Sequence, residues 1–81
     1  MTRKRIKVTE RKLGRSGALG LYYSDGRMEI DPRQDSREYL DTLIHEALHA
    51  RFPWMTEEEV IVSANVISDI VWKQNFRRIK E

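Results

Sequence analysis

Both histidines of the chain lie in one stretch, Leu43-Ile44-His45-Glu46-Ala47-Leu48-His49-Ala50, with a single glutamate between them. Residues four apart stack on the same face of an α-helix, so a helix over this stretch would place His45 and His49 side by side. Glu46 would project next to them. Two imidazoles one turn apart can bind one metal ion together, and zinc takes such ligands while a neighbouring carboxylate accepts a proton from water. The stretch therefore predicts a zinc site on a helix.

Local signals predict that this helix runs over about residues 36–51. Asp35 and Glu38 have the spacing of a capping box, in which the first residue caps the helix and the second lies three positions on. Apolar residues follow at the spacing i, i+3, i+4, i+7 and i+8, and they are Leu40, Leu43, Ile44, Ala47 and Leu48. At about 100° per residue, the two histidines lie roughly 130–170° from the middle of this stripe. We therefore expect the leucines to face the core and the histidines to lie off that face.

A second helix is predicted over about residues 57–78. Phe52 precedes Pro53 and is biased away from helical dihedrals, so the first helix ends there. Thr56 and Glu59 then form another capping box. The short connection makes the two helices antiparallel neighbours, which returns the start of the second helix to the end of the first. The predicted core-facing stripe of the second helix is Val60, Ala64, Ile67 and Val71, flanked by Ser63, Ile70 and Gln74.

Three short strands are predicted within about residues 5–31. Residues 5–13 and 18–23 carry alternating or strand-forming residues, and a glycine-containing turn separates them. Asp25-Gly26 is a pair favoured in tight hairpins, and residues 28–31 follow as the third strand before Pro32. We expect these strands to form a small antiparallel sheet. The whole chain, residues 1–81, is then predicted to be one α+β domain, with an antiparallel three-stranded sheet followed by two antiparallel helices.

The composition limits the kind of site and the location. Because the chain has no cysteine, it has neither a disulfide framework nor a cysteine-ligated zinc finger, and a metal would be held by histidine and carboxylate. No apolar run reaches membrane-spanning length, and no apolar segment follows the basic N-terminus, so we expect no signal peptide, no membrane association and a cytoplasmic location. Positive charges gather at both ends of the chain, and we interpret them as solvated faces rather than as a nucleic-acid site.

A third ligand is expected from the start of the second helix. A catalytic zinc site has three protein ligands and keeps a fourth position open, and with both histidines used the third must be a carboxylate. Glu57 continues the apolar stripe backwards from Val60, whereas Glu58 falls nearly opposite it and Glu59 is used in the capping box. Glu57 is the predicted ligand and Glu58 the alternative. Three glutamates in a first turn also complement the helix dipole without a metal, but their position one short loop after the histidines favours the metal site.

His45-Glu46-Ala47-Leu48-His49, followed by a helix that carries Glu57, resembles the gluzincin zinc metallopeptidases in a very short form, over residues 43–71. The approach through residues 28–32 resembles small phage and prokaryotic metallopeptidases sometimes called minigluzincins, in which an edge strand precedes the motif helix. The resemblance implies a minimal zincin-like fold, with Zn²⁺ bound by His45, His49 and Glu57. It also implies that Glu46 is the general base and proton shuttle.

The chain departs from longer relatives of this kind at several positions. The spacing from His49 to Glu57 is much shorter than in thermolysin-like enzymes, and Phe52 and Met55 stand where metzincins carry a glycine and a third histidine. No histidine remains to stabilise an oxyanion. The alternatives for that role, among which spacing does not choose, are Tyr22, Tyr23, Tyr39 and Arg27.

Three functions follow as expectations. The first is a zinc-dependent peptidase acting on a peptide or protein substrate, in which Glu46 accepts the proton of the attacking water. The predicted third strand, with Met28, Glu29 and Ile30, would hold the extended substrate as a sheet edge. The second is a metal-stabilised structural or regulatory protein, proenzyme-like or inactive, in which zinc contributes folding free energy. Nucleic-acid binding through the basic ends is less favoured, because Glu57–Glu59 make the helical hairpin acidic.

Overall fold

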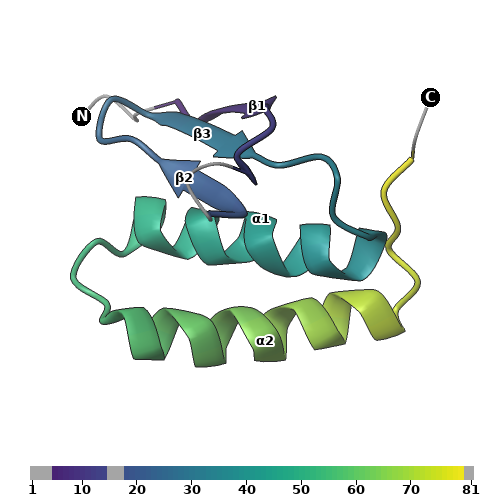
Figure 1. Cartoon of the computed structure of the whole chain (residues 1–81). Coiled ribbons are helices and arrows are strands. Elements are labelled where there is room, and N and C mark those ends of the chain that lie inside the picture. Colours follow the sequence, from purple (N-terminus) through teal and green to yellow (C-terminus); the bar gives the residue numbers. More distant parts are fainter. Residues whose placement is uncertain (1–4, 15–17, 80–81) are drawn as a thin grey trace.

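The computed structural model describes residues 5–14 and 18–79, and within them it contains three strands and two helices. These elements are β1 (Lys7–Glu10), β2 (Gly20–Tyr22), β3 (Arg27–Ile30), α1 (Ser36–Arg51) and α2 (Glu57–Lys73). They form three layers, with α1 between the sheet on one side and the antiparallel α2 on the other (Figure 1). The predicted α+β fold, a three-stranded sheet followed by two antiparallel helices, is confirmed in this order of elements.

The sheet is mixed, so the prediction of a purely antiparallel sheet is wrong. Its strand order is β1-β3-β2, with β3 antiparallel to β2 and parallel to β1. The predicted Asp25-Gly26 hairpin joins β2 to β3, and Gly26 has a φ of 98° there, a conformation that glycine adopts without strain. The hairpin occupies one side of β3, and β1 adds to the other side. Alternation of side chains specifies the faces of a strand, but not its neighbour or the direction of that neighbour.

This topology also overturns the predicted substrate-binding edge at Met28, Glu29 and Ile30. These residues belong to the central strand, whose backbone pairs with β1 on one side and with β2 on the other. Met28 and Ile30 are 1% and 0% exposed and belong to the core. A paired and buried strand has no free backbone groups to offer a peptide, so β3 cannot serve as the edge.

The core lies on two sides of α1. Towards the sheet, Tyr39 packs with Met28 and Ile30, and the partly buried Leu43 and Ala50 extend this cluster. Towards the other layer, α2 contributes the buried residues Val60, Ala64 and Ser68. The buried positions of α1 are Tyr39 and Thr42 rather than the predicted leucine stripe, whose members are half-buried or, at Ala47, exposed. A helix between two layers distributes its burial over two faces, and a single-stripe pattern does not describe it.

Both helices begin where the capping signals predicted. Asp35 accepts a hydrogen bond from the backbone N–H of Glu38, and α1 has the predicted bounds. α2 begins at Glu57 but ends at Lys73, five residues before the predicted end at residue 78. Asn75 adopts a left-handed φ of 66°, a conformation that commonly ends helices at Gly or Asn. Neither helix of the described part of the chain is long and apolar enough to cross a lipid bilayer.

Asp31 connects the segment after β1 to the start of the β3–α1 connection. Its carboxylate accepts hydrogen bonds from the backbone N–H groups of Leu13 at 2.8 Å and Arg33 at 3.0 Å, and it pairs with the Arg33 guanidinium at 2.7 Å. Asp31 is only 3% exposed. The Arg33 side chain, followed by the two backbone N–H groups, holds the pKa of Asp31 well below its usual range. The ionised carboxylate is therefore part of the folded structure.

Replacing Asp31 with Asn should lower the melting temperature near neutral pH by roughly 5 °C or more, because the amide offers only one acceptor oxygen to these donors. Folding lowers the pKa of Asp31, so its carboxylate stabilises the fold above the unfolded pKa of about 4 and loses this effect as the pH falls through the lower folded pKa. The difference between the two proteins should therefore narrow below about pH 4. Thermal unfolding followed by circular dichroism measures the two melting temperatures. A difference in melting temperature that stays constant over the whole pH range would contradict this role of Asp31.

Candidate metal centre

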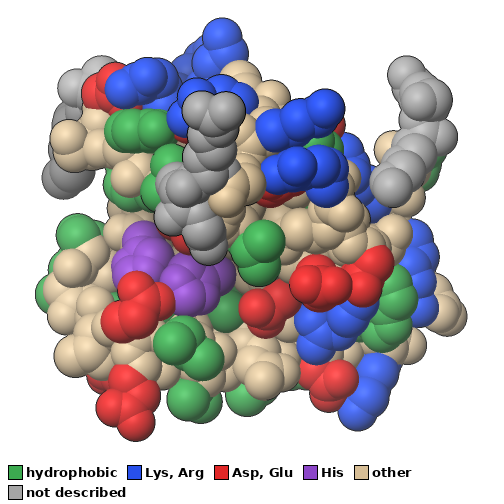
Figure 2. Space-filling view, in the orientation of Figure 1, with side chains coloured by type: hydrophobic (Ala, Val, Ile, Leu, Met, Phe, Trp, Pro, Cys, Tyr) green, Lys and Arg blue, Asp and Glu red, His purple; other side chains and the backbone are tan. Residues whose placement is uncertain are grey.

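The connection between the helices brings the predicted ligands together. His45 and His49 lie one turn apart near the end of α1, and Glu57 is the first residue of α2. The backbone N–H of Phe52 donates to the carbonyl of Leu48 and closes α1, and the Thr56 capping box opens α2. Because this loop is short, the first turn of α2 lies over the last turns of α1. The two histidines form one surface patch beside an acidic side chain (Figure 2).

The three ligand groups converge on one point. Glu57 Oε1 lies 2.7 Å from His45 Nε2, Glu57 Oε2 lies 3.2 Å from His49 Nε2, and the two Nε2 atoms are 3.2 Å apart. In a tetrahedral zinc complex with bonds of about 2.0–2.1 Å, ligand atoms are separated by about 3.3 Å. The two Nε2 atoms are close to this separation, and a rotation of the Glu57 carboxylate would bring one of its oxygens towards both of them. These residues could therefore hold a zinc ion.

The chemistry of the three groups also fits a cation. The two Nε2 atoms lie 3.2 Å apart and both lie within 3.2 Å of the Glu57 carboxylate, and a neutral imidazole can present a lone pair at Nε2. Two such lone pairs and a carboxylate oxygen are ligands that a cation accepts together. The donor set, two nitrogens and one oxygen, is that of catalytic rather than of cysteine-rich structural zinc sites.

The centre is accessible to solvent. The side chains of His45, His49 and Glu57 are 21%, 28% and 62% exposed. An ion bound by these three groups would have room for a fourth ligand from solvent, as catalytic zinc sites require.

Glu46 lies beside the histidines but outside this group of ligands. It is half-buried, and burial raises its pKa, an effect that the neighbouring histidines oppose. The predicted division between ligands and a separate carboxylate is therefore present in the geometry. Glu57 is the glutamate that reaches the histidines, whereas Glu59 accepts the backbone N–H of Thr56 at 2.9 Å and Glu58 is exposed outside the group.

Gly20 is a site residue that was not predicted. A Cβ atom at this position would lie 2.7 Å from Thr42 Cγ2 and 3.0 Å from Glu46 Cγ, so the backbone of β2 packs directly on α1 beside the motif glutamate. The contact with Thr42 lies one turn before Glu46. A glycine within a predicted strand often marks such a close backbone approach, and this was the available signal.

The residues considered for oxyanion stabilisation have structural partners. The Tyr39 hydroxyl donates to Glu10 at 2.8 Å, and the Tyr23 hydroxyl donates to Glu29 at 2.9 Å. Arg27 pairs with Asp25 at 2.8 Å. Tyr22 packs against the core cluster. The structure therefore does not bring any of these four side chains into the group formed by the histidines and Glu57.

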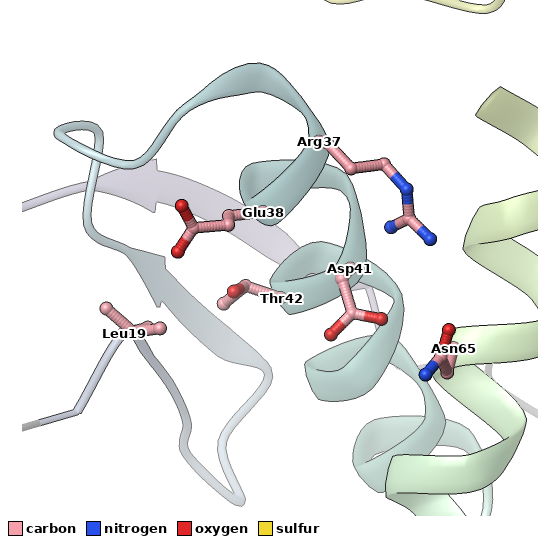
Figure 3. A pocket seen from close by; sticks show the side chains of 6 residues that line it. All are labelled: Leu19, Arg37, Glu38, Asp41, Thr42 and Asn65. Carbon is pink, nitrogen blue, oxygen red and sulfur yellow. The ribbon is translucent and has the colours of Figure 1, made fainter.

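A polar pocket lies further along α1, towards its N-terminal end. It has a volume of about 320 Å³, and Thr42 connects it to the contact between β2 and Glu46. Glu38 projects from α1 towards the side of Leu19, whereas Asp41 lies on the side of Asn65 of α2 (Figure 3). Its lining residues are Leu19, Arg37, Glu38, Asp41, Thr42 and Asn65. A hollow thus lies over the N-terminal half of α1, between Leu19 and Asn65 of α2.

Comparisons of the chain with protein-family models, with curated proteins and with solved structures found no match. The case for a metal centre therefore depends on the spacing of His45, Glu46 and His49 in the sequence and on the position of Glu57 in the fold. Neither observation depends on a comparison with another protein.

Glu57→Gln should weaken Zn²⁺ binding by about 100-fold or more, because the variant keeps the size of the side chain but loses the anionic ligand. Glu58→Gln is the matched control, since it removes the same charge from the next residue of the same helical turn. Its affinity should stay within about twofold of the wild type, as expected for an exposed charge near the site. Isothermal titration calorimetry with Zn²⁺ measures both, and equal losses in the two variants would exclude Glu57 as a ligand.

Gly20→Ala should destabilise the fold by about 1–3 kcal/mol, because the new methyl group overlaps Thr42 and Glu46. Adding Thr42→Ser should recover part of this loss, since it removes Cγ2 and keeps the hydroxyl that donates to Gln34 at 2.6 Å. Urea unfolding of the two single variants and of the double variant separates these effects. If the two changes are additive, Gly20 and Thr42 do not interact as the structure places them.

Proposed function

We propose that the chain is a zinc-dependent metallopeptidase that hydrolyses peptide bonds at the centre formed by His45, His49 and Glu57. One observation carries the proposal: the helical hairpin brings the Glu57 carboxylate within 2.7 Å and 3.2 Å of the two Nε2 atoms, and Glu46 stays outside this group. The same ligands and the same free glutamate are what the resemblance to gluzincins and minigluzincins implies. The substrate class is a peptide or protein.

Three of the residues would bind the metal, and Glu46 would transfer the proton. His45, His49 and Glu57 would hold Zn²⁺, which when bound supplies a Lewis acid that polarises a carbonyl group and acidifies water. Two neutral imidazoles and one carboxylate leave a net positive charge at such a centre, which favours the developing oxyanion. Glu46 takes the proton of the attacking water and delivers it to the leaving amine.

The substrate would lie along β2 rather than along β3. Within the described residues, β2 pairs only with β3, so one side of Gly20–Tyr22 is a free sheet edge. An extended peptide can pair with such an edge through its backbone. Because Gly20 packs against Glu46, this edge lies next to the proposed general base. The pocket that contains Thr42 and Asp41 is on the same side of the molecule and could accept a substrate side chain.

A structural role for the metal is the second candidate, and the origin of the ligands favours it. His45 and His49 come from α1 and Glu57 comes from α2, so an ion bound to all three would link the two helices. Binding of a metal to the folded state alone stabilises that state. This role predicts a higher melting temperature with zinc but no hydrolysis.

Nucleic-acid binding is less favoured than either metal-based function. Several arginines of the described residues are engaged by carboxylates, which reduces the positive charge available to phosphates. These pairs are Arg11 with Glu29, Arg27 with Asp25, Arg33 with Asp31 and Arg78 with Glu10.

Glu46→Gln should abolish peptide hydrolysis, with a loss of at least about 100-fold, and should leave the Zn²⁺ affinity within about threefold of the wild type. The glutamine amide cannot accept the proton of the attacking water. Zinc affinity is retained because Glu46 is not one of the proposed ligands. His45→Ala should lose both hydrolysis and zinc binding, whereas Glu58→Gln should keep both. Cleavage of a peptide library followed by mass spectrometry, together with zinc titration, measures these properties. Wild-type hydrolysis in Glu46→Gln would exclude the proposed mechanism, and zinc-dependent stabilisation without any cleavage would favour the structural role.

A further inference from the structure

α2 is apolar on two opposite faces, but only one of them is covered within the described chain. Its inner face packs on α1 through Val60 and Ala64, which are both 0% exposed. On the other side, Val62, Val66 and Ile70 are 60%, 55% and 59% exposed. At about 100° per residue, the centres of the two faces are separated by about 140°. A helix that is apolar on both sides is typical of a position between two layers, yet α2 is an outer layer (Figure 1).

The exposed residues Val62, Val66 and Ile70, here called the outer stripe, form a continuous row at the spacing i, i+4, i+8. All three are β-branched, so they lose little side-chain entropy when a surface covers them. Continuous apolar surface of this kind marks interaction sites more often than scattered apolar residues do. Charged residues stand at the two ends of the outer stripe, Glu59 before it and Lys73 after it. Glu59 also accepts the backbone N–H of Thr56, and Lys73 pairs with Asp69 at 3.0 Å but keeps 72% of its side chain exposed.

We propose that the outer stripe is the interface of a homodimer, in which α2 packs antiparallel against α2 of a second copy about a two-fold axis at Val66. A two-fold axis there brings Val66 against Val66 of the partner subunit, and Val62 into the same layer as Ile70 of the partner subunit. The same operation places Glu59 near Lys73 of the partner subunit, at both ends of the contact. Opposite charges therefore meet twice.

The charges select this arrangement over the alternatives. A parallel pairing would bring Glu59 to Glu59 of the partner subunit and Lys73 to Lys73 of the partner subunit, and like charges repel. Antiparallel pairing also opposes the two helix dipoles. A symmetric dimer needs a surface that is complementary to itself, and the outer stripe meets this condition because its apolar residues and its end charges are arranged symmetrically about Val66.

The dimer is independent of the proposed peptidase function. Glu57 lies on the opposite side of α2 from Val66, about 180° away by helical periodicity, so the candidate metal centre remains accessible. The 17 residues of α2 span only about 25 Å. An interface of this length is at the low end of the size range of specific interfaces, so we expect a weak dimer that forms only at high protein concentration.

Analytical ultracentrifugation of the full chain between about 5 μM and about 1 mM tests the proposal, and a monomer–dimer equilibrium is expected. Val66→Glu should raise the dissociation constant at least tenfold, about 1.4 kcal/mol, because two carboxylates would face each other at the axis. Ile61→Glu is the matched control, since Ile61 is 53% exposed on the same helix but lies off the outer stripe. Circular dichroism and zinc affinity of Val66→Glu should equal those of the wild type, which separates loss of association from unfolding and from damage to the metal centre.

A pair of substitutions tests the antiparallel register. Lys73→Glu alone should weaken association, because Glu59 of one copy then meets a glutamate of the other. Adding Glu59→Gln should recover part of the lost affinity, since it removes this repulsion while glutamine keeps the capping box of α2. A wild-type chain that is monomeric at about 1 mM, an unchanged dissociation constant in Val66→Glu, or a double variant as weak as the single one would overturn the proposed dimer.

Discussion

The antiparallel packing of α2 on α1 is the contact on which the candidate centre depends, because the three ligand groups come from both helices. Two polar contacts define the register of this pair. At one end, the buried Ser68 accepts a hydrogen bond from Arg37 at 2.9 Å and lies 3.1 Å from a carboxylate oxygen of Asp41. At the other end, Glu57 meets the histidines of α1. A shift of one residue along the helix would rotate Glu57 by about 100° and remove it from them.

Because α1 lies between the sheet and α2, its histidines and its Glu46 side chain face different layers. The side of α1 that faces α2 presents the histidines to Glu57, at the surface of the molecule. The side that faces the sheet places Glu46 beneath β2, where Gly20 lets the two backbones approach closely. One helix thus supplies two partly exposed histidines and, directly after the first of them, a half-buried carboxylate.

The same three-layer arrangement leaves α2 with apolar surface that the described chain does not cover. A chain of 81 residues buries only roughly 60–65% of the surface that its unfolded form exposes, and its core is correspondingly thin. Inner residues such as Val60 and Ala64 complete that core, whereas no described segment of the chain packs against the outer stripe. Association with a second copy would give α2 the two-sided environment that its sequence pattern indicates, and it would do so away from the metal centre.

The sequence by itself determined the features that depend on neighbouring residues. Capping signals at Asp35 and Thr56 predicted the starts of both helices, and the spacing of His45 and His49 placed them on one face. Glu57 could be chosen over Glu58 because the loop between the helices is short. The way the two helix ends meet then depends mainly on neighbouring residues. Only the tertiary structure decided the order of the strands, the two-sided burial of α1 and the approach of Gly20 to Glu46. These depend on contacts between segments far apart in the sequence, and side-chain alternation does not specify which segments meet.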